Sequence, residues 1–507
     1  MKTPSLAGRF AAAIALTIGF YVLALVIVAA CLAAAILPWV FRGSNNLWLT
    51  VIGVFLAFSV LTGLIPRRLR FVPDGVRISP ADQPRLFALI DDEVDAAKEA
   101  PPERVYATLQ VNAAVTEVGG GRVMEVGLPL MHMLSERELR SVIAHELGHY
   151  AGGDTRLGPW IYRTRETIMR TVSRLTKAND DMWSRRLVRT PFIWYGNAFL
   201  RITNTISRRQ EFAADARAAL SAGRDAQVSA LRRVHAYGAA FDGYWMNEVV
   251  PVLDAKRRPP IGEGFRRFIA DDGVERTAKE ILERELAEGT TSPYDSHPSL
   301  PERIAAVQEL PAGEPDASPP AISLVDDPEA LERAILDKLL GDEAGEFQAI
   351  AWDEVGRGVY LERARHLTGE FPQIIRDVSV GGLPEAVEAI PRTAAELRGP
   401  QDDRLVDQAV EAGFPDGTEY VANLVAAVLA DGVIAALERA GWEIEAPPAQ
   451  PVAARRGADV LQPHTAVHEL RAGDLSAETW RDRVSALGVA DLPLAAESRP
   501  AGSPAAA

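Results

Sequence analysis

The sequence predicts an α+β protein that is mainly α, with an N-terminal transmembrane helical hairpin, a central domain that has a small β-sheet edge, and a C-terminal α-rich accessory domain. Three observations predict this fold. The chain starts with two long uncharged apolar intervals, its middle part combines short strand patterns with helical stripes, and its last part is mostly helical in pattern. At 507 residues, the chain is long enough for all three parts.

The N-terminal region, residues 1–70, carries the membrane signal. No charged residue lies between Arg9 and Arg42, or between Arg42 and Arg67, and each interval supplies the roughly 20 apolar residues that cross a bilayer. We predict transmembrane helices near 14–37 and 47–65; the first interval exceeds one straight span, so we expect tilt or a buried extension. Because Lys and Arg flank the pair more heavily than its connecting turn, both ends should face the cytoplasm, as in a multi-pass cell-membrane protein.

A cleaved signal peptide is the alternative interpretation of this region, since VAAC at 28–31 resembles a lipoprotein cleavage box. The apolar stretch continues beyond Cys31 and a second apolar interval follows, which favours the helical pair. Cys31 is the only cysteine, so no intramolecular disulfide can form. This mildly favours a cytosolic catalytic domain and decides nothing further.

Strand patterns follow the membrane region. Residues 105–111 and 113–118 are predicted to be strands, and Gly119, Gly120 and Gly121 turn the chain into a further strand at 122–126.

A helix is predicted next. Ser135 with Glu138 three positions later forms a capping box, and Gly152 and Gly153 end the run. Its apolar stripe consists of Leu139, Val142, Ile143 and Leu147. The helix carries the motif HELGH at 145–149, in which two histidines four positions apart project from one face and can bind one ion.

A second helix surrounds the motif EFAAD at 211–215, with Gly223 as its predicted end. Its predicted buried stripe consists of Phe212, Ala213, Ala216 and Leu220. A catalytic zinc takes three protein ligands and keeps one position open, and His, His and Glu are one of the known sets. We therefore expect one Zn²⁺ per chain, bound by His145, His149 and Glu211.

Two further residues of these motifs have predicted roles. Glu146 points to a different angle of the helix from the histidines, toward the water, and is the natural general base. Asp215 lies one turn beyond Glu211 and can accept a hydrogen bond from a ligating imidazole, which fixes its tautomer. The set predicts peptide-bond hydrolysis. His464 and His468 are also four apart, but no acid fills the position after His464, so we interpret them as structural histidines.

Three segments together resemble the signatures of the HtpX-like and CAAX prenyl endopeptidase family of membrane zinc metallopeptidases: SVIAHELGHYAGGDT at 141–155, SRRQEFAADA at 207–216 and SHPSLPERI at 296–304. The resemblance covers roughly residues 1–310 and implies a zincin-type catalytic domain at 78–309. It also implies that His297 stabilises the oxyanion and that Arg303 supports the site. From the residues alone, His297 beside a proline is as readily a loop residue, and Arg303 an ordinary surface charge.

The strands before the metal helix are similar to the edge strand of that family, which implies a surface that hydrogen-bonds an extended substrate backbone. The segment concerned is Asn112, Ala113, Ala114 and Val115. Family members usually have an aromatic residue at the place of Ala114, so the shape of the pocket should differ here. A core hairpin is compatible with the same role.

Residues 156–209 are locally basic, with twelve Lys and Arg against three acids, and are rich in Trp and Tyr. This mixture is typical of helices that lie against anionic headgroups. Our hypothesis is an amphipathic segment that rests on the inner leaflet and walls the cleft, which makes membrane lipid a partner. A solvated helical hairpin with a basic face accounts for the pattern equally well.

The C-terminal part begins with residues 310–322, whose Pro, Gly, Ala and acidic residues predict a linker. The accessory domain, 323–489, carries helical patterns, and its apolar run 421–437 is interrupted by Asp431 and Gly432, which favours a buried helix over a third span. Residues 490–507 are expected to be a disordered tail.

The net charge of −15 argues against nucleic acid as a partner. The sequence thus predicts a membrane-anchored zinc endopeptidase that acts on protein or peptide substrates, with membrane or misfolded membrane-associated proteins as the expected class. Two alternatives stay open. The first is a non-proteolytic zinc-stabilised membrane scaffold that binds partners through its C-terminal domain, against which the intact Glu146 argues. The second is a peptidase whose catalytic domain lies outside the cytoplasm. The oligomeric state does not follow from the sequence.

Overall fold

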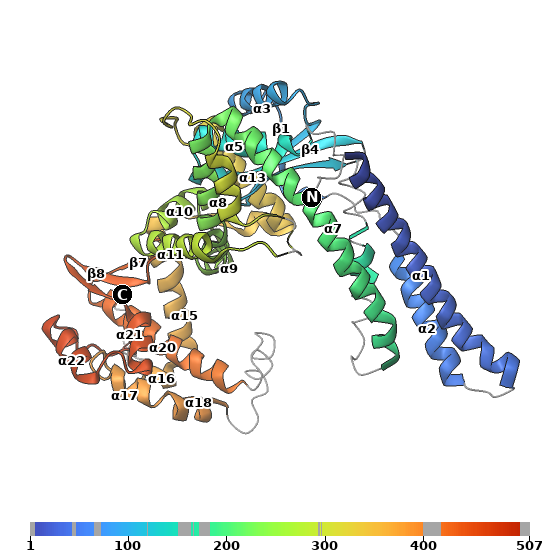
Figure 1. Cartoon of the computed structure of the whole chain (residues 1–507). Coiled ribbons are helices and arrows are strands. Elements are labelled where there is room, and N and C mark those ends of the chain that lie inside the picture. Colours follow the sequence, from blue (N-terminus) through green and yellow to red (C-terminus); the bar gives the residue numbers. More distant parts are fainter. Residues whose placement is uncertain are drawn as a thin grey trace. The chain divides into compact units, whose positions relative to one another are not determined.

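Figure 1 shows the computed structural model of the chain, which describes residues 6–42, 47–64, 72–118, 120–150, 164–165, 167–171, 183–292, 295, 297–398 and 417–496. These residues are mainly helical with small sheets, which confirms the α+β, mainly α class. The chain divides into two compact units, each made of two sequence segments. The first comprises Met1–Ala239 and Thr277–Leu339, and the second Ala240–Arg276 and Leu340–Ala507.

The first unit starts with two long apolar helices, α1 (Leu6–Arg42) and α2 (Leu47–Leu64). By length and composition, Ile14–Phe41 and Leu47–Leu64 are each able to cross a membrane, close to the predicted spans. With 37 residues, α1 is about 55 Å long, well beyond a hydrocarbon core of roughly 30 Å. The two helices pack closely at Gly53: a Cβ at this position would lie only 2.6 Å from the backbone oxygen of Cys31.

A third long helix, α7 (Trp183–Ala222), runs alongside this hairpin (Figure 1). Phe192 and Phe199 of α7 are buried in one apolar cluster with Phe20 of α1, and the rings of Phe192 and Phe20 meet edge-on at 6.0 Å. The aromatic residues of the basic segment therefore turn partly onto the hairpin, although Trp194 stays exposed. Residues 156–163, 166 and 172–182 of that segment lie outside the described residues, and its contact with lipid stays a prediction.

Four strands form the sheet of the first unit, in the order β1-β2-β4-β3. Their bounds are Val76–Ile78 for β1, Arg104–Thr108 for β2, Ala113–Val118 for β3 and Gly121–Gly127 for β4. β2 and β4 are parallel, and the other pairs are antiparallel. β3 lies at an edge of the sheet, as the resemblance implied for this segment. Asn112 directly precedes it, and the predicted strand 105–111 ends earlier than expected.

The helix of the HELGH motif, α5 (Glu136–Gly148), starts at the predicted capping box. The Ser135 hydroxyl accepts a hydrogen bond from the Glu138 N–H at 3.1 Å, and the Glu138 carboxylate accepts one from the Ser135 N–H at 2.8 Å. The helix ends at Gly148, so His149 is its first residue beyond the last turn. The predicted stops, Gly152 and Gly153, lie outside the described residues, as does Gly119.

The C-terminal half of α7 packs against α5, and here the predicted stripe was partly wrong. Ala213 is exposed and Leu220 is 73% exposed, whereas Ala214, Ala218 and Ala219 are buried. The reason is a close approach of the two helices: a Cβ on Gly148 would lie 3.1 Å from the Cα of Ala214. Only small side chains fit there, so the largest apolar residues do not mark the buried face. Gly223 ends the helix with a φ of 98°, as predicted.

The remaining helices of the first unit surround α5 and α7 or continue into the second unit. They are α3 (Pro84–Ala97), α4 (Leu128–Met133), α8 (Arg224–Tyr244), α11 (Asp272–Glu288), α12 (Leu300–Gln308), the 3₁₀ turn η3 (Ala321–Leu324) and α13 (Pro328–Leu340).

The segment predicted to be a linker, 310–322, is docked on the start of α5. Ser135 and Pro320 form an isolated β-bridge, Ala321 N–H donates to the Leu134 carbonyl at 2.8 Å, and Arg137 donates to the Glu314 carbonyl at 2.7 Å. The boundary between the two units therefore falls after α13, and not at this segment.

The second unit takes residues 240–276 from the sequence range predicted for the catalytic domain. β5 (Arg257–Arg258) pairs in parallel with β6 (Gln348–Ala349), although the two are far apart in sequence. Tyr244 packs against the rings of Phe265 and Trp352, at 5.6 and 6.0 Å. Pairing over this distance leaves no local sequence signal, which is why the predicted boundary was misplaced.

A buried helix, α20 (Thr418–Arg439), forms the centre of the second unit. It is long and apolar enough to cross a membrane, but 72% of its apolar window is buried in the structure, in line with the predicted buried helix. Asp431 in its middle is fully buried and lies 2.8 Å from Nε2 of His464, so His464 has a structural partner here.

The second unit contains further helices and a second sheet, several of which pack against α20. The helices are α9 (Val250–Asp254), α10 (Ile261–Ile269), α14 (Trp352–Val355), α15 (Glu362–Glu370), α16 (Pro372–Ile375), α17 (Leu383–Glu388), α18 (Ile390–Arg398), α21 (Pro463–Ala472) and α22 (Ala477–Ala486), with π-helical turns at Trp245–Val249 and Gly356–Leu361 and a 3₁₀ turn at Gly341–Glu346. An antiparallel sheet consists of β7 (Glu443–Glu445), β8 (Ala453–Arg456) and β9 (Asp459–Leu461).

The chain stays packed beyond the predicted start of the disordered tail. Leu494 is 1% exposed within the core around α20, and its N–H donates to the Val378 carbonyl at 2.9 Å. The prediction was therefore wrong for residues 490–496, because Leu492 and Leu494 give this stretch apolar contacts. Residues 497–507 lie outside the described residues.

Candidate metal centre

A cleft of about 360 Å³ in the first unit brings the predicted site residues together. It is bordered by the start of β3 and by α5, α7, α8 and the segment around α12. Its lining includes Asn112, Ala113, Ala114, His145, Glu146, His149, Glu211, His297 and Arg303. Residues that are almost 200 positions apart in sequence thus meet in one place.

Three side chains converge in this cleft in the manner expected of a metal site. The Nε2 atoms of His145 and His149 are 3.2 Å apart; that of His145 lies 3.6 Å from Oε2 of Glu211, and that of His149 lies 3.6 Å from Oε1. Donor atoms around a tetrahedral zinc with bonds of about 2.0–2.1 Å are separated by about 3.3 Å, so the observed separations fit. The Oε2 atom of Glu211 is buried and accepts no hydrogen bond within the described part of the chain. Two imidazoles and one carboxylate are a donor set that suits Zn²⁺.

The charge states of these groups also suit a cation. The pKa of His149 is lowered to about 4, mainly by burial and secondly by the neighbouring His145. Its ring is therefore neutral at neutral pH and keeps a lone pair for a metal. Burial alone would raise the pKa of Glu211, but its hydrogen bond with His297 and the nearby histidines hold that pKa below its usual value. The Glu211 carboxylate is therefore ionised.

Glu146 lies beside the two histidines. Ligand-type atoms of His145, Glu146 and His149 all lie within 4.8 Å of one another. Burial raises the pKa of Glu146, against the opposing effect of His145 and of the Val115 N–H, which is directed at the carboxylate. A carboxylate of raised pKa beside a metal site is suited to accept a proton and to release it again.

Asp215 lies next to His145 and is held by Arg303. Arg303 donates to both carboxylate oxygens, from Nε at 2.8 Å and from Nη2 at 2.7 Å. Oδ1 of Asp215 also lies 3.0 Å from Nδ1 of His145, at an angle short of a well-formed hydrogen bond. Burial opposes ionisation of Asp215, but the hydrogen bonds from Arg303 and the nearby imidazole of His145 keep its pKa below the usual value. With 11% of its side chain exposed, Arg303 is not a surface charge.

His297 reaches the cleft from the loop before α12. Its Nδ1 lies 3.0 Å from Oε1 of Glu211, while 66% of its side chain is exposed. This hydrogen bond, rather than burial, raises the pKa of His297. The residue is thus placed at the open side of the cleft, beside the carboxylate that completes the donor set.

Several residues of the site were missed by sequence reasoning. Gln227 bonds to Asp215 from α8, Ser141 bonds to Gln227 from α5, and Tyr150 bonds to the backbone of β3. His235, also on α8, lines the cleft and is paired with Glu285 at 2.9 Å. These are common polar residues outside any motif. The only sequence signal that could have identified one of them is that Tyr150 directly follows His149.

Part of the cleft lining is apolar. It is formed by Leu130 of α4, Val142 of α5, and Ala230, Leu231 and Val234 of α8. Such a wall next to the metal donors can accommodate an apolar side chain.

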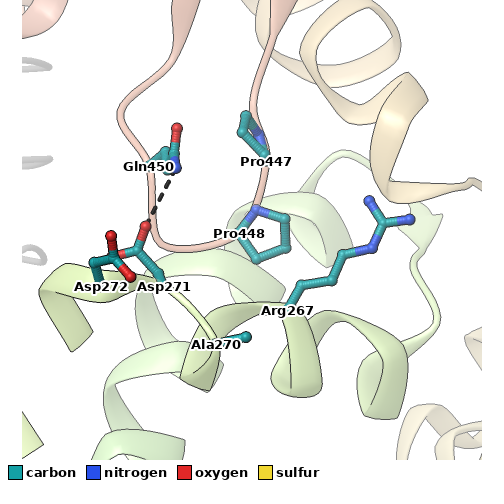
Figure 2. A pocket seen from close by; sticks show the side chains of 7 residues that line it. All are labelled: Arg267, Ala270, Asp271, Asp272, Pro447, Pro448 and Gln450. Atoms are coloured by element: carbon teal, nitrogen blue, oxygen red, sulfur yellow. Dashed lines mark hydrogen bonds between the residues drawn. The ribbon is translucent and has the colours of Figure 1, made fainter. Parts of the chain in front are cut away.

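The second unit has a hollow of its own, also of about 360 Å³ (Figure 2). Its charged residues serve the structure: Arg267 pairs with Glu263 and Asp353, and Oδ1 of Asp271 accepts the Gly273 N–H at the start of α11. Gln450 from the β7–β8 loop donates to Asp271 at 3.2 Å (Figure 2). This hollow carries no comparable convergence of metal donors among the described residues.

Comparison with known proteins agrees with the geometry of the first unit. Residues 80–311 match peptidase family M48. We refer to residues 80–311, which match this family, as the M48 domain. This domain includes every residue of the donor set, together with Glu146, Asp215, His297 and Arg303.

Relatives of the M48 domain are named as HtpX proteases. The chain is 24% identical over 236 residues to the protease HtpX homolog of Archaeoglobus fulgidus, 26% over 227 residues to protease HtpX of Alcanivorax borkumensis, and 27% over 252 residues to that of Hahella chejuensis. These matches cover 45%, 42% and 46% of this chain and 68%, 66% and 76% of the relatives. The M48 domain is thus similar to HtpX proteases, and it follows two helices that are long and apolar enough to cross a membrane.

Proposed function

We propose that this chain is a membrane-anchored, zinc-dependent endopeptidase that hydrolyses peptide bonds of membrane or misfolded membrane-associated proteins. The observation that carries the proposal is the convergence of His145, His149 and Glu211 on one point beside Glu146. The M48 match and the HtpX-like relatives support it.

His145, His149 and Glu211 would hold the ion, with Asp215 fixing the tautomer of His145. When bound, Zn²⁺ supplies a Lewis acid that activates water and polarises the scissile carbonyl. The side chains of this chain then have to move one proton and stabilise one negative charge.

Glu146 takes the proton of the attacking water and passes it to the leaving amine. Its position beside the donor set and its raised pKa support both halves of this transfer. His297 stabilises the oxyanion that develops on the carbonyl, because its exposed ring stands at the open side of the cleft. Arg303 acts on Asp215 and not on the substrate.

The substrate backbone binds along β3 in an extended form. β3 is an edge strand and the cleft is lined by its first residues, Ala113 and Ala114, and by Asn112 before them. Backbone hydrogen bonds along such an edge make few demands on the substrate sequence. The small side chain of Ala114 widens the cleft where relatives of this type usually carry an aromatic ring.

The anchor places the catalytic domain at the cytoplasmic face. Lys and Arg that flank the hairpin support this orientation. Fusion of a topology reporter after Arg77 tests it: reporter activity on the outside would support the alternative of a peptidase that acts beyond the cytoplasm.

The proteolytic proposal is tested with Glu146→Gln. Turnover of casein and of membrane proteins is compared between the wild type and this variant in detergent, with the zinc content of both measured. We expect equal zinc content and at least a 100-fold loss of turnover, in line with the loss of a general base. Equal turnover in both proteins removes the proteolytic function and leaves the zinc-stabilised scaffold.

A further inference from the structure

The carboxylate of Asp215 receives more hydrogen bonds than the ExxxD pattern indicates. Besides Arg303, the side-chain amide of Gln227 donates to Oδ1 from Nε2, at 2.9 Å. The same Oδ1 atom is the one that lies 3.0 Å from Nδ1 of His145. Gln227 therefore acts on the oxygen that faces the imidazole.

The orientation of the Gln227 amide is fixed from its other end. The hydroxyl of Ser141 donates a hydrogen bond to Oε1 of Gln227. Because only the NH₂ group can donate to a carboxylate, the amide has a single orientation that satisfies both neighbours. Gln227, Ser141 and Asp215 are all buried, so no exposed water competes for these bonds.

The network closes on the metal helix. Ser141 lies on α5 one turn before His145, Gln227 lies on α8, and Asp215 lies on α7. Three helices that supply or support the donor set are thus linked through one amide side chain. Arg303 donates to both oxygens of Asp215 from α12, and Gln227 adds a second donor to Oδ1, the oxygen that faces His145.

We propose that Gln227 is a positioning residue of the metal centre, which holds Asp215 so that Asp215 orients His145 for a divalent cation. This inference rests on the proposed function, since it takes His145 to be a zinc ligand. Hydrogen-bond partners behind metal ligands typically change metal affinity by about 10- to 100-fold when they are removed.

The test is Gln227→Met in the full-length protein in detergent, which keeps an unbranched side chain of similar size and removes both hydrogen bonds. Zn²⁺ affinity is measured by competition with a chromophoric chelator. Gln83→Met is the matched control: Gln83 is also buried in the first unit and makes two hydrogen bonds, at 3.0 and 2.7 Å, but to the backbone of Asp326. We expect about 10- to 100-fold weaker Zn²⁺ binding for Gln227→Met and wild-type affinity for Gln83→Met.

Should Gln227→Met fail to fold, as judged by circular dichroism of the apo protein, Ser141→Ala takes its place, because it removes a single oxygen and frees the amide to turn. Its expected effect is a several-fold weaker affinity for Zn²⁺. Wild-type affinity in the folded variant, or an equal loss in Gln83→Met, overturns the role of Gln227. A wild-type protein that binds no Zn²⁺ overturns the proposed function itself, so the two failures are distinguishable.

Discussion

The hydroxyl of Tyr150 donates a hydrogen bond to the backbone carbonyl of Val115, with 2.6 Å between the two oxygens. Tyr150 directly follows His149, so this bond ties the end of the metal helix to the edge strand β3. Because the Gly127 N–H bonds to the Asn112 carbonyl, antiparallel alternation turns the backbone groups of Ala113 and Val115 outward. The outward carbonyl of Val115 accepts from Tyr150 and its N–H faces Glu146, so the proposed substrate backbone would bond to the outward groups of Ala113.

Tyr150→Phe removes only this hydroxyl. We expect a several-fold lower kcat with unchanged zinc content. Without the Tyr150 hydroxyl the Val115 backbone is less well fixed, so its N–H is no longer directed at the Glu146 carboxylate. The loss of one hydrogen bond should also lower the free energy of unfolding by about 1 kcal/mol. Peptidase kinetics and urea denaturation measure the two effects.

Tyr244→Phe is the matched control for this variant. Its hydroxyl donates to the Ile261 carbonyl at 2.8 Å in the second unit, so the same kind of bond is lost. A similar loss of stability with wild-type kcat is expected there. If the two variants have the same kcat, Tyr150 has no role beyond stability.

Asp215→Ala should destabilise the first unit strongly in the absence of metal. It leaves the largely buried guanidinium of Arg303 without its two carboxylate bonds, and breaking a buried pair typically costs about 3–5 kcal/mol. The free energy of unfolding of the apo protein is measured by urea denaturation, because bound metal would add its own stabilisation.

Asp326→Ala provides the comparison. Its carboxylate pairs with Arg85 at 2.6 Å, a distance similar to that of the Asp215–Arg303 pair, but both side chains are exposed. Exposed pairs contribute less than about 1 kcal/mol. Equal effects of the two substitutions would show that the Asp215–Arg303 pair does not stabilise the fold.

The stability of the second unit should depend on pH through Glu248. Burial raises the pKa of Glu248, against the bond from the Ala449 N–H, above the unfolded value of 4.5. The folded state thus binds this proton more tightly, and the resulting stabilisation is full below pH 4.5 and is lost as the pH rises through the folded pKa. The glutamine of Glu248→Gln stays neutral at every pH. The melting temperature of this variant relative to the wild type should therefore rise as the pH increases from 4.5 through the folded pKa of Glu248.

Glu343→Gln should show the opposite trend. Hydrogen bonding and the charge of Lys256 lower the pKa of Glu343, so its contribution is present above the unfolded pKa and is lost as the pH falls through the folded pKa. This variant should therefore be less stable than the wild type at neutral pH and approach it in acid. The same trend in both variants would contradict the assigned causes.

The parts of the site that the sequence predicted are those set by local geometry. Helical spacing alone places His145 and His149 on one face, and the capping box at Ser135 marks where that helix starts. The uncharged intervals on both sides of Arg42 likewise define the hairpin by their own length. In each case the physical cause lies within one turn or one segment of the chain.

The parts that were missed arise where distant segments meet. Gln227 and Ser141 lie 86 positions apart, and nothing in either neighbourhood indicates that they bond. Leu220 is apolar but exposed, because the close approach at Gly148 admits only alanines on that face. The segment 310–322 has the composition of a linker, but whether such a stretch docks depends on the backbone partners offered by α5.

The central claim is that Glu211 completes a zinc site with His145 and His149. It is tested most directly by the Zn²⁺ content and affinity of chelator-treated, zinc-reconstituted wild type and Glu211→Ala, with Glu285→Ala as a control at the neighbouring His235 pair. We expect one tightly bound Zn²⁺ per chain in the wild type and in the control, and its loss in Glu211→Ala. A Glu211→Ala protein that retains one Zn²⁺ with wild-type affinity would contradict this account.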